Sequence, residues 1–293
     1  MVIGVADNPL GATGRGWQTD VDMRLTKHHG LANDFLVLLD PDGSHPLDPH
    51  VARALCDHRT GIGADGLIRA TPAVGEDAAA RMELRNADGS TAEMSGNGVR
   101  CLGQALLRDG WTTGPIVQIQ TDAGLRTVTV HAQLDEVTHE LSVDMGYPRI
   151  DGEAPEWSGG SVERALWVDF GNPHLVLELT ASAPANIDPE LLELGERVNA
   201  KVAGGANVHL LRPTADGGIA VRTYERGVGP TQACGTGACA SAVAARTWGL
   251  VGDAVPVEQP GGTAEVTIGD AVVLRGPATF VATVELPGAW PWH

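Results

Sequence analysis

The chain has 293 residues, with 20 lysines and arginines against 37 aspartates and glutamates, and a formal net charge of −17. Such an acidic surface repels phosphate backbones and anionic lipids, so we expect neither a nucleic-acid nor a membrane partner. The length suits two domains or one large one. Glycine (38) and proline (18) make up about a fifth of the chain, less than in a disordered composition, and indicate turns or close backbone approach to a ligand.

The first residues and the cysteines bear on the cellular location of the protein and on metal or disulfide sites. The first 20 residues lack the basic start and long apolar segment of a signal peptide, and no apolar run approaches the roughly 18 residues that span a bilayer. We therefore expect a cytoplasmic protein with a mobile extension at residues 1–20. The four cysteines form no CxxC pair and match no zinc pattern, so we expect neither a disulfide scaffold nor a metal site.

Short apolar runs between Gly- and Asp-rich turns predict strands. In chain order they are 35–39, 116–119, 166–168, 175–179 and 272–274, and the alternating run 125–131 predicts a half-buried strand. Helices are fewer. They are predicted over 48–56 with Asp48 as N-cap, from about 98 to 108, over 189–198 with Asp188 as N-cap, and from about 237 to 248. The pattern is mixed α+β, and without a GxGxxG after a strand or a GxxxxGK[ST] it disfavours a Rossmann or P-loop nucleotide site.

A weak internal repeat precedes two of these helices. Residues 95–98 (SGNG) lead into the first, and residues 234–237 (CGTG) lead into the second, 139 positions later. The repeat indicates two similar halves, although four-residue matches with two glycines also arise by chance.

The two Gly-rich helix entrances are candidate binding sites for an anion. Each exposes free backbone N–H groups, and the helix dipole favours negative charge there, so a carboxylate can bind. The same field lowers the pKa of a thiol at the entrance. Cys234 therefore has two interpretations, a reactive thiolate or a small buried residue of the turn. Cys101 and Cys239 follow further along the two helices and are expected in the core, as is Cys56.

Polar residues suited to a small zwitterionic ligand recur in short turns. Asparagine amides accept from an ammonium and donate to a carboxylate, although any single asparagine also suits a turn for local reasons. An arginine can hold a carboxylate bidentately, and a glutamate or histidine can orient a ligand or move protons. The residues of this kind are Asn33, Asn86, Asn97, Asn172, His174, Asn207, Glu225, Arg226 and Thr236.

Six segments, in this order, together resemble diaminopimelate epimerase. They are 27–35 (KHHGLANDF), 61–66 (GIGADG), 86–101 (NADGSTAEMSGNGVRC), 171–174 (GNPH), 205–208 (GANV) and 224–240 (YERGVGPTQACGTGACA). The resemblance implies an isomerase without a cofactor, usually a homodimer, that interconverts LL- and meso-diaminopimelate for lysine and cell-wall synthesis by two-base proton transfer at the α-carbon.

The resemblance also implies a fold. It is α+β, with two pseudo-symmetric domains, each a curled, mostly antiparallel sheet around a central helix, and the site lies in the cleft between them. On this basis we place the first domain at 21–138 with 275–293, because the last strand completes it, and the second domain at 139–274.

The resemblance also implies which residues form the site, because each position of the family motifs has a matching position in this sequence. The implied substrate contacts are Asn33, Asn86, Gly96, Asn97, Asn172, Asn207, Glu225, Arg226, Gly235 and Thr236. His174 and Glu225 match the groups that assist the two bases, and Cys234 matches the second catalytic cysteine. The sequence departs from the family at Ala32, where the family has glycine, and at Ser95, where it has the first catalytic cysteine.

Ser95 leaves three interpretations open, since a hydroxyl is a far weaker base than a thiolate unless a neighbour activates it. In the first, the Ser95 hydroxyl acts as the acid and base, and His174 or Glu225 relays its proton. In the second, serine is a deliberate change from cysteine. Alternatively, the chain carries out one-base chemistry or acts on another amino acid, as do superfamily members that eliminate water from hydroxyproline. A non-catalytic homologue that only binds an amino acid is a further alternative.

Overall fold

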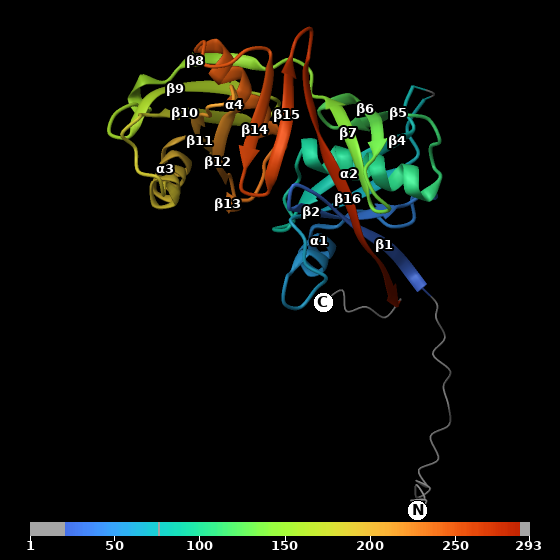
Figure 1. Ribbon diagram of the computed structural model, residues 1–293. Coiled ribbons are helices and arrows are strands. Elements are labelled where there is room, and N and C mark those ends of the chain that lie inside the picture. Colours follow the sequence, from blue (N-terminus) through green and yellow to red (C-terminus); the bar gives the residue numbers. More distant parts are fainter. Residues whose placement is uncertain (1–20, 76, 288–293) are drawn as a thin grey trace, which may run out of the picture.

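The computed structural model describes residues 21–75 and 77–287. The extension predicted at residues 1–20 lies outside the described residues, as do residues 288–293 of the predicted first domain. The chain forms two lobes side by side, one from the blue and green part of the chain and one from the yellow and orange part (Figure 1). None of the helices in the described part is long and apolar enough to cross a membrane.

The first lobe is a curled sheet around the helix α2. Its elements are β1 (Val21–Gly30), β2 (Asn33–Leu39), α1 (Pro49–Cys56), β3 (Gly66–Thr71), β4 (Ala80–Asn86), α2 (Gly96–Asp109), β5 (Ile116–Thr121), β6 (Gly124–Gln133) and β7 (Thr138–Asp144). The strands pair in chain order, and the final strand β16 (Val272–Pro287) pairs with both β7 and β1. This double pairing closes the sheet around α2, so the last strand of the chain completes the first lobe.

The second lobe surrounds the helix α4. Its elements are β8 (Arg149–Glu153), the 3₁₀ turn η1 (Pro155–Trp157), β9 (Val162–Asp169), β10 (Pro173–Leu179), α3 (Asp188–Lys201), β11 (Asn207–Pro213), β12 (Ile219–Glu225), β13 (Gly229–Thr231), α4 (Gly235–Thr247), β14 (Ala254–Gln259) and β15 (Gly262–Ile268). α4 packs against β9 to β12, β14 and β15. β15 pairs with β16, which joins the two lobes into one continuous sheet.

The two lobes repeat one pattern of connections. In the first, β2 runs parallel to β3 across α1, and β4 runs parallel to β5 across α2. In the second, β10 runs parallel to β11 across α3, and β12 runs parallel to β14 across α4. The remaining pairs are antiparallel. The predicted two-domain α+β fold with a central helix in each curled, mostly antiparallel sheet is therefore confirmed, and α2 and α4 occupy equivalent places.

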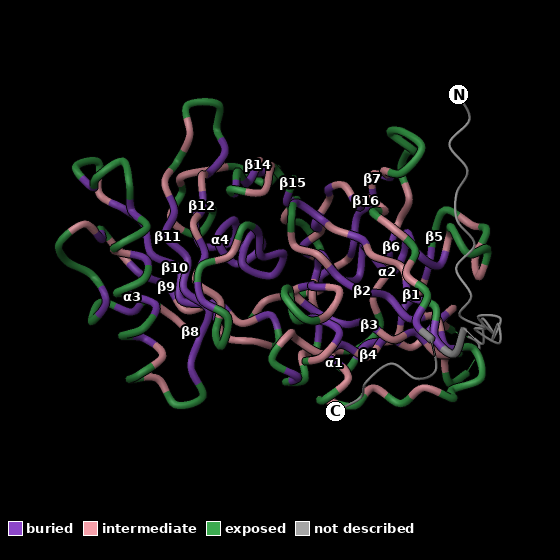
Figure 2. Tube along the Cα trace, turned by 90° about the horizontal axis from the view of Figure 1, so that it is seen from below, coloured by how far each residue is buried: buried purple, intermediate pink, exposed green. Residues whose placement is uncertain are grey.

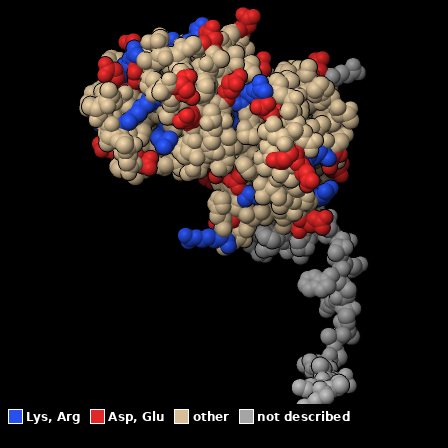
Figure 3. All heavy atoms as spheres, viewed as in Figure 1, with Lys and Arg blue, Asp and Glu red and all other residues tan. Residues whose placement is uncertain are grey.

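The central helices are buried on all sides. Residues 96–106 of α2 and residues 235–245 of α4 are all buried, and Figure 2 shows both helices inside the lobes. A helix that is enclosed by a sheet must be apolar or small around its whole circumference, and the Ala-, Gly- and Ser-rich sequence of α4 meets this need. Acidic side chains are instead spread over the outside of both lobes (Figure 3), as the net charge requires.

The predicted elements are present, with two corrections. α2 and α4 begin two residues earlier than predicted, because Ser95 and Cys234 are their N-caps. Asp188 is not the N-cap of α3: it lies inside the helix after Ile187, and Asn186 accepts a hydrogen bond from its N–H (3.2 Å). Cys56, Cys101 and Cys239 are buried, as expected for core residues.

The predicted division of the chain into 21–138 with 275–293 and 139–274 stays a prediction. Its first boundary falls at the start of β7, which pairs on one side with β6 and on the other with β16. Its last boundary falls inside β16. We infer that the first domain extends to the end of β7 and includes all of β16, because a strand paired on both sides cannot be divided from its sheet.

The departure from the family at Ala32 falls on a strained turn. Leu31 and Ala32 connect β1 to β2 with φ values of 57° and 62°. This left-handed conformation favours glycine, since a Cβ there crowds the following carbonyl at a cost of about 1–2 kcal/mol. Neighbouring backbone fixes the turn: a Cβ on Gly261 would lie only 1.9 Å from the carbonyl oxygen of Leu31. The turn sets the position of Asn33, the next residue.

Candidate active site

The N-termini of the two central helices present a hydroxyl and a thiol. Ser95 precedes α2 in an extended conformation, and its Oγ accepts the N–H of Gly98 at 3.1 Å. Cys234 precedes α4 in a similar conformation, and its Sγ accepts the N–H of Gly237 at 3.4 Å. Both side chains therefore act as N-caps, the role that places a polar side chain at the mouth of a helix.

The two helix entrances adjoin each other. A Cβ on Gly235 would lie 3.0 Å from the backbone nitrogen of Asn97 and 3.1 Å from the Cα of Gly96, so any side chain there would press on the backbone of α2. The N–H groups of Gly96, Asn97, Gly235 and Thr236 make no hydrogen bond to any described residue. Four free donors and two helix dipoles thus converge on one place, which suits a carboxylate.

Replacing Gly235 by alanine is expected to disrupt this junction. The new methyl group would press on the backbone of α2, and overpacking of this kind costs about 1–3 kcal/mol in the free energy of unfolding. Chemical denaturation measures the loss, and activity should fall with it. Gly252→Ala is the matched control, since a Cβ there meets nothing within 4 Å. Equal stability of the two variants would mean that the helix entrances do not adjoin.

A pocket of about 670 Å³ opens at this junction and is lined by residues of both lobes. It brings together most of the predicted site residues: Asn33, Asn86, Ser95, Asn172, Asn207, Glu225, Arg226, Cys234, Gly235 and Thr236. The side chain of Arg226 is exposed, and its Nη1 donates to the carbonyl of Gly204 at 3.0 Å, so it is held at the rim.

Gly96, Asn97 and His174 do not line the pocket. The side chain of Asn97 lies behind the wall and donates to Oδ1 of Asn33 at 3.1 Å. His174 is fully buried, with its Nε2 2.9 Å from Oδ1 of Asn172 and its Nδ1 2.8 Å from Nε2 of His209. Burial, together with His209, lowers the pKa of His174 well below its usual value, so the ring is neutral. His174 thus holds the amide of Asn172, and among the described residues neither it nor Glu225 hydrogen-bonds to Ser95.

Cys234 lies against a carboxyl group that suits proton exchange. Glu225 lies close enough to the Cys234 thiol to act on it electrostatically, and Thr231 Oγ1 donates to Glu225 Oε1 at 2.7 Å. Burial raises the pKa of Glu225 to about 7. Burial and the nearby Glu225 also raise the pKa of Cys234. The lowering of the Cys234 pKa expected at a helix entrance is therefore wrong, because desolvation outweighs the dipole and the cap. The thiol must pass its proton to a base before it can act.

The structure adds site residues that the sequence left unassigned. Asp65 lines the pocket and accepts from the Nδ2 of Asn33 at 2.7 Å. Gln259 Oε1 accepts the backbone N–H of Cys234 at 2.8 Å, and His209 supports His174. Asp65 lies in the quoted segment GIGADG, so a signal was present. Gln259 lies in no motif, and only the pairing of β14 with β12 brings it to Cys234.

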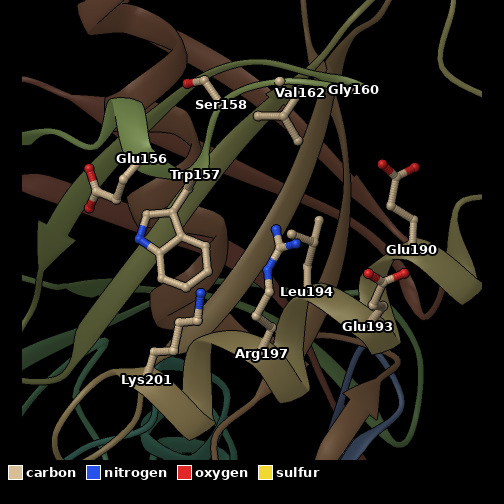
Figure 4. A pocket seen from close by; sticks show the side chains of 11 residues that line it. Glu156, Trp157, Ser158, Gly160, Val162, Glu190, Glu193, Leu194, Arg197 and Lys201 are labelled. Atoms are coloured by element: carbon tan, nitrogen blue, oxygen red, sulfur yellow. The ribbon is translucent and has the colours of Figure 1, made fainter.

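A second hollow, of about 510 Å³, lies between η1 and α3 in the second lobe alone. Figure 4 shows Arg197 and Lys201 of α3 directed toward the indole of Trp157, with their charged ends 5.5 and 5.8 Å from the ring. Its lining contains no cysteine, histidine or hydroxyl beside a base. It contains glutamates and a lysine, which can move protons, but not the thiol and hydroxyl at helix N-termini that the pocket between the lobes contains.

The fold and the site define an enzyme of the isomerase class, an epimerase. A family model described as "Diaminopimelate epimerase" matches residues 25–150 and 166–281. The chain is 37% identical to a curated diaminopimelate epimerase of Mycolicibacterium smegmatis over 92% of this chain and 99% of that protein. It is 38% identical to that of Corynebacterium glutamicum over 89% and 96%. The chain belongs to the diaminopimelate epimerase family.

Solved structures share the fold at lower sequence identity. A hydroxyproline epimerase of Agrobacterium vitis with bound trans-4-hydroxy-L-proline superposes with a TM-score of 0.72 at 17% identity, covering 94% of both chains. A probable proline racemase of Agrobacterium radiobacter superposes with the same TM-score at 18% identity, covering 91% of this chain and 93% of that one. These similarities concern the fold, and the two-lobed architecture extends over nearly the whole described chain.

Proposed function

We propose that the chain interconverts LL- and meso-diaminopimelate by moving the α-proton, with Cys234 and Ser95 on opposite faces of the α-carbon. One observation carries the proposal: a thiol and a hydroxyl cap two adjoining helices, and both of these side chains line one pocket. The curated relatives, which are diaminopimelate epimerases, support the substrate. The reaction then supplies the meso isomer for lysine and cell-wall synthesis.

The proposed steps use only groups of the chain. The α-carboxylate binds the N–H groups of Gly235 and Thr236 at the entrance of α4, beside the entrance of α2. Glu225, as carboxylate, takes the proton of Cys234, and the thiolate then removes the α-proton. The electron pair of the broken C–H bond stays on the substrate, where the N–H groups and helix dipoles stabilise the developing negative charge. Ser95 delivers its hydroxyl proton to the opposite face, which inverts the centre, and takes up a proton from water, while Glu225 releases the proton that it took from Cys234 to solvent. The reverse reaction exchanges the roles of Cys234 and Ser95.

The remaining pocket residues are proposed to hold the substrate. His174 donates to Asn172 Oδ1, so the Nδ2 of Asn172 is free to donate to a carboxylate. Asn207 Oδ1 accepts the backbone N–H of Arg226 at 3.0 Å, so its amide nitrogen is free in the same way. Asn33, Asn86 and Arg226 are the other pocket residues that are proposed to contact the substrate. Asn97 is proposed to act through Asn33. The homodimer and the cytoplasmic location stay predictions.

Replacing Glu225 by glutamine is expected to lower kcat/KM about 10- to 100-fold, because an amide cannot take the thiol proton. In the unchanged protein, kcat/KM should rise as the pH increases through about 7, where the Glu225 carboxyl loses its proton and becomes a base. The variant should lose this rise. A pH–rate profile measures both effects, with Glu258→Gln, an exposed carboxylate, as control. An unchanged profile in Glu225→Gln would remove Glu225 from the mechanism.

One-base chemistry is the second candidate, and a specific observation favours it. Ser95 Oγ accepts one backbone N–H, and no titratable side chain of the described residues hydrogen-bonds to it. A serine without a base transfers protons slowly. On this reading Cys234 exchanges the α-proton with solvent, but the centre is not inverted. Comparing the rate of exchange with the rate of inversion separates the two candidates.

A further inference from the structure

Arg100 is a charged residue inside the first lobe that the proposed mechanism does not use. It lies in the second turn of α2 and is 0% exposed. Its Nη2 donates to Oδ1 of Asn97 at 2.8 Å, while Nε and Nη1 have no hydrogen-bond partner among the described residues. No described carboxylate forms an ion pair with it. Burying a guanidinium without a counter-ion lowers the stability of the fold, so Arg100 is a candidate for a functional role.

The backbone around Arg100 is shaped to accept it. A Cβ on Gly30 of β1 would lie 3.2 Å from Nη2, and a Cβ on Gly276 of β16 would lie 3.5 Å from the same atom. Two glycines on strands that come together only in the folded sheet thus leave room for the guanidinium. Burial lowers the pKa of Arg100 to about 10, so the side chain stays positively charged at neutral pH.

Arg100 fixes the orientation of a chain of amides that leads to the pocket. A guanidinium only donates, so Asn97 must turn Oδ1 toward Arg100 and Nδ2 toward Asn33. Asn33 must then accept with Oδ1 and donate with Nδ2 to Asp65, at 2.7 Å. The donor at the buried end and the Asp65 carboxyl at the pocket end therefore favour the same orientation of both amides, and Arg100 is the group that fixes Asn97 directly. Both Asn33 and Asp65 line the pocket.

The same residue places positive charge behind the helix entrances. Asn97, which Arg100 contacts, contributes a free N–H at the point where α2 meets Gly235. Because the surroundings are buried, a charge acts there at low effective dielectric constant and over a longer range than at the surface. An anion bound at the N–H groups would supply the negative charge that the folded protein does not place beside Arg100.

We propose that Arg100 is a positioning residue: it orients Asn97 and Asn33 and makes the pocket selective for a ligand with a carboxylate at the helix entrances. The carboxylate of the substrate then acts as its counter-ion. In naming the substrate this inference rests on the proposed function, but its electrostatic part does not, because any small anion that enters the pocket should be attracted.

The test compares a charged and a neutral reagent at one thiol. Cys234 is the one cysteine among the residues that line the pocket. Its alkylation by iodoacetate, an anion, and by iodoacetamide, which is neutral, is followed by peptide mass spectrometry on the full chain. Replacing Arg100 by methionine is expected to lower the rate ratio of iodoacetate to iodoacetamide about three- to tenfold, as loss of one buried charge at this depth implies. An unchanged ratio overturns the proposal.

Two further variants keep the test decisive. Arg212→Met removes a half-buried arginine that donates to the backbone at residues 183 and 184, outside the pocket lining, and should leave the ratio unchanged. An equal fall there would show a general charge effect and contradict the proposal. Arg100→Lys keeps the charge, so its iodoacetate-to-iodoacetamide rate ratio should stay within about twofold of that of the unchanged protein. If the methionine variant does not fold, the lysine variant alone tests the proposal. A threefold or larger fall of the ratio in the lysine variant contradicts it.

The positioning role has its own readout. A lysine ammonium lacks the planar donor that fixes the Asn97 amide, so Arg100→Lys should lower kcat/KM for diaminopimelate about tenfold. Full activity in Arg100→Lys would contradict the positioning role. If the unchanged protein shows no turnover at all, the proposed function fails, while the alkylation ratio still tests Arg100, so the two failures are distinguishable.

Discussion

Replacing Cys234 by alanine is expected to lower turnover about 10³-fold or more. Cys234 is the thiol that lines the pocket, and it is the N-cap of α4. Loss of the acid/base on one face removes a contribution that is typically 10²–10⁴-fold, and no neighbouring group in the pocket can replace it, because Glu225 reaches the reaction only through this sulfur in the proposed steps. Steady-state rates with LL-diaminopimelate, followed by chiral separation of the isomers, measure the effect.

The cysteine five residues further along the same helix gives the matched control. Cys239 is fully buried and lies outside the pocket lining, so Cys239→Ala should retain activity within about threefold, apart from the stability lost with a small cavity. The folding of both variants is compared by circular dichroism. If Cys234→Ala keeps substantial turnover, the thiol is not the base, and the mechanism proposed above is wrong.

Replacing Ser95 by cysteine is expected to raise turnover about 10²-fold. The hydroxyl accepts a single backbone N–H and has no base partner among the described residues, so it is a poor proton donor and acceptor near neutral pH. A thiol at the same N-cap has a pKa far closer to neutrality and would mirror Cys234 on the other helix. Because Oγ and Sγ occupy the same cap, the substitution changes the chemistry with little change in packing.

Ser95→Ala gives the complementary result. It removes the proton-transfer group and the cap together, so turnover should fall below that of the unchanged protein, with about 1 kcal/mol lost in the free energy of unfolding. If Ser95→Cys brings no gain, the pocket has adapted to serine. If Ser95→Ala inverts the substrate as fast as the unchanged protein, Ser95 transfers no proton.

The sequence predicted the architecture well because its signals are local. Glycines at the start of α2 and α4, the alternation of apolar residues in β6 and the Asp–Pro start of α1 each constrain a few neighbouring residues. Most of the residues carried over with the segments that resemble the family line one pocket. Asp188 is an exception to this success. An aspartate before a proline suits an N-cap, but in the structure Asn186 accepts the N–H of Asp188 and the helix begins at Asp188 itself.

Long-range electrostatics could not be predicted in the same way. The pKa of Cys234 depends on burial and on Glu225, and the helix entrance alone gave the wrong direction. The neutral pair His174 and His209 joins residues of two strands, and the unpaired charge of Arg100 depends on glycines in β1 and β16. Each of these features arises only when segments far apart in the chain pack together, so no pattern within one segment reveals it.

The most direct test of the central claim is the fate of the α-proton. The unchanged protein is incubated with LL-diaminopimelate in D₂O, and the deuterium content and the isomers are measured together over time. We predict that deuterium enters the α-position and that the meso isomer forms at a comparable rate. Exchange without inversion would contradict the two-base mechanism, and the absence of both exchange and inversion would contradict the proposed function.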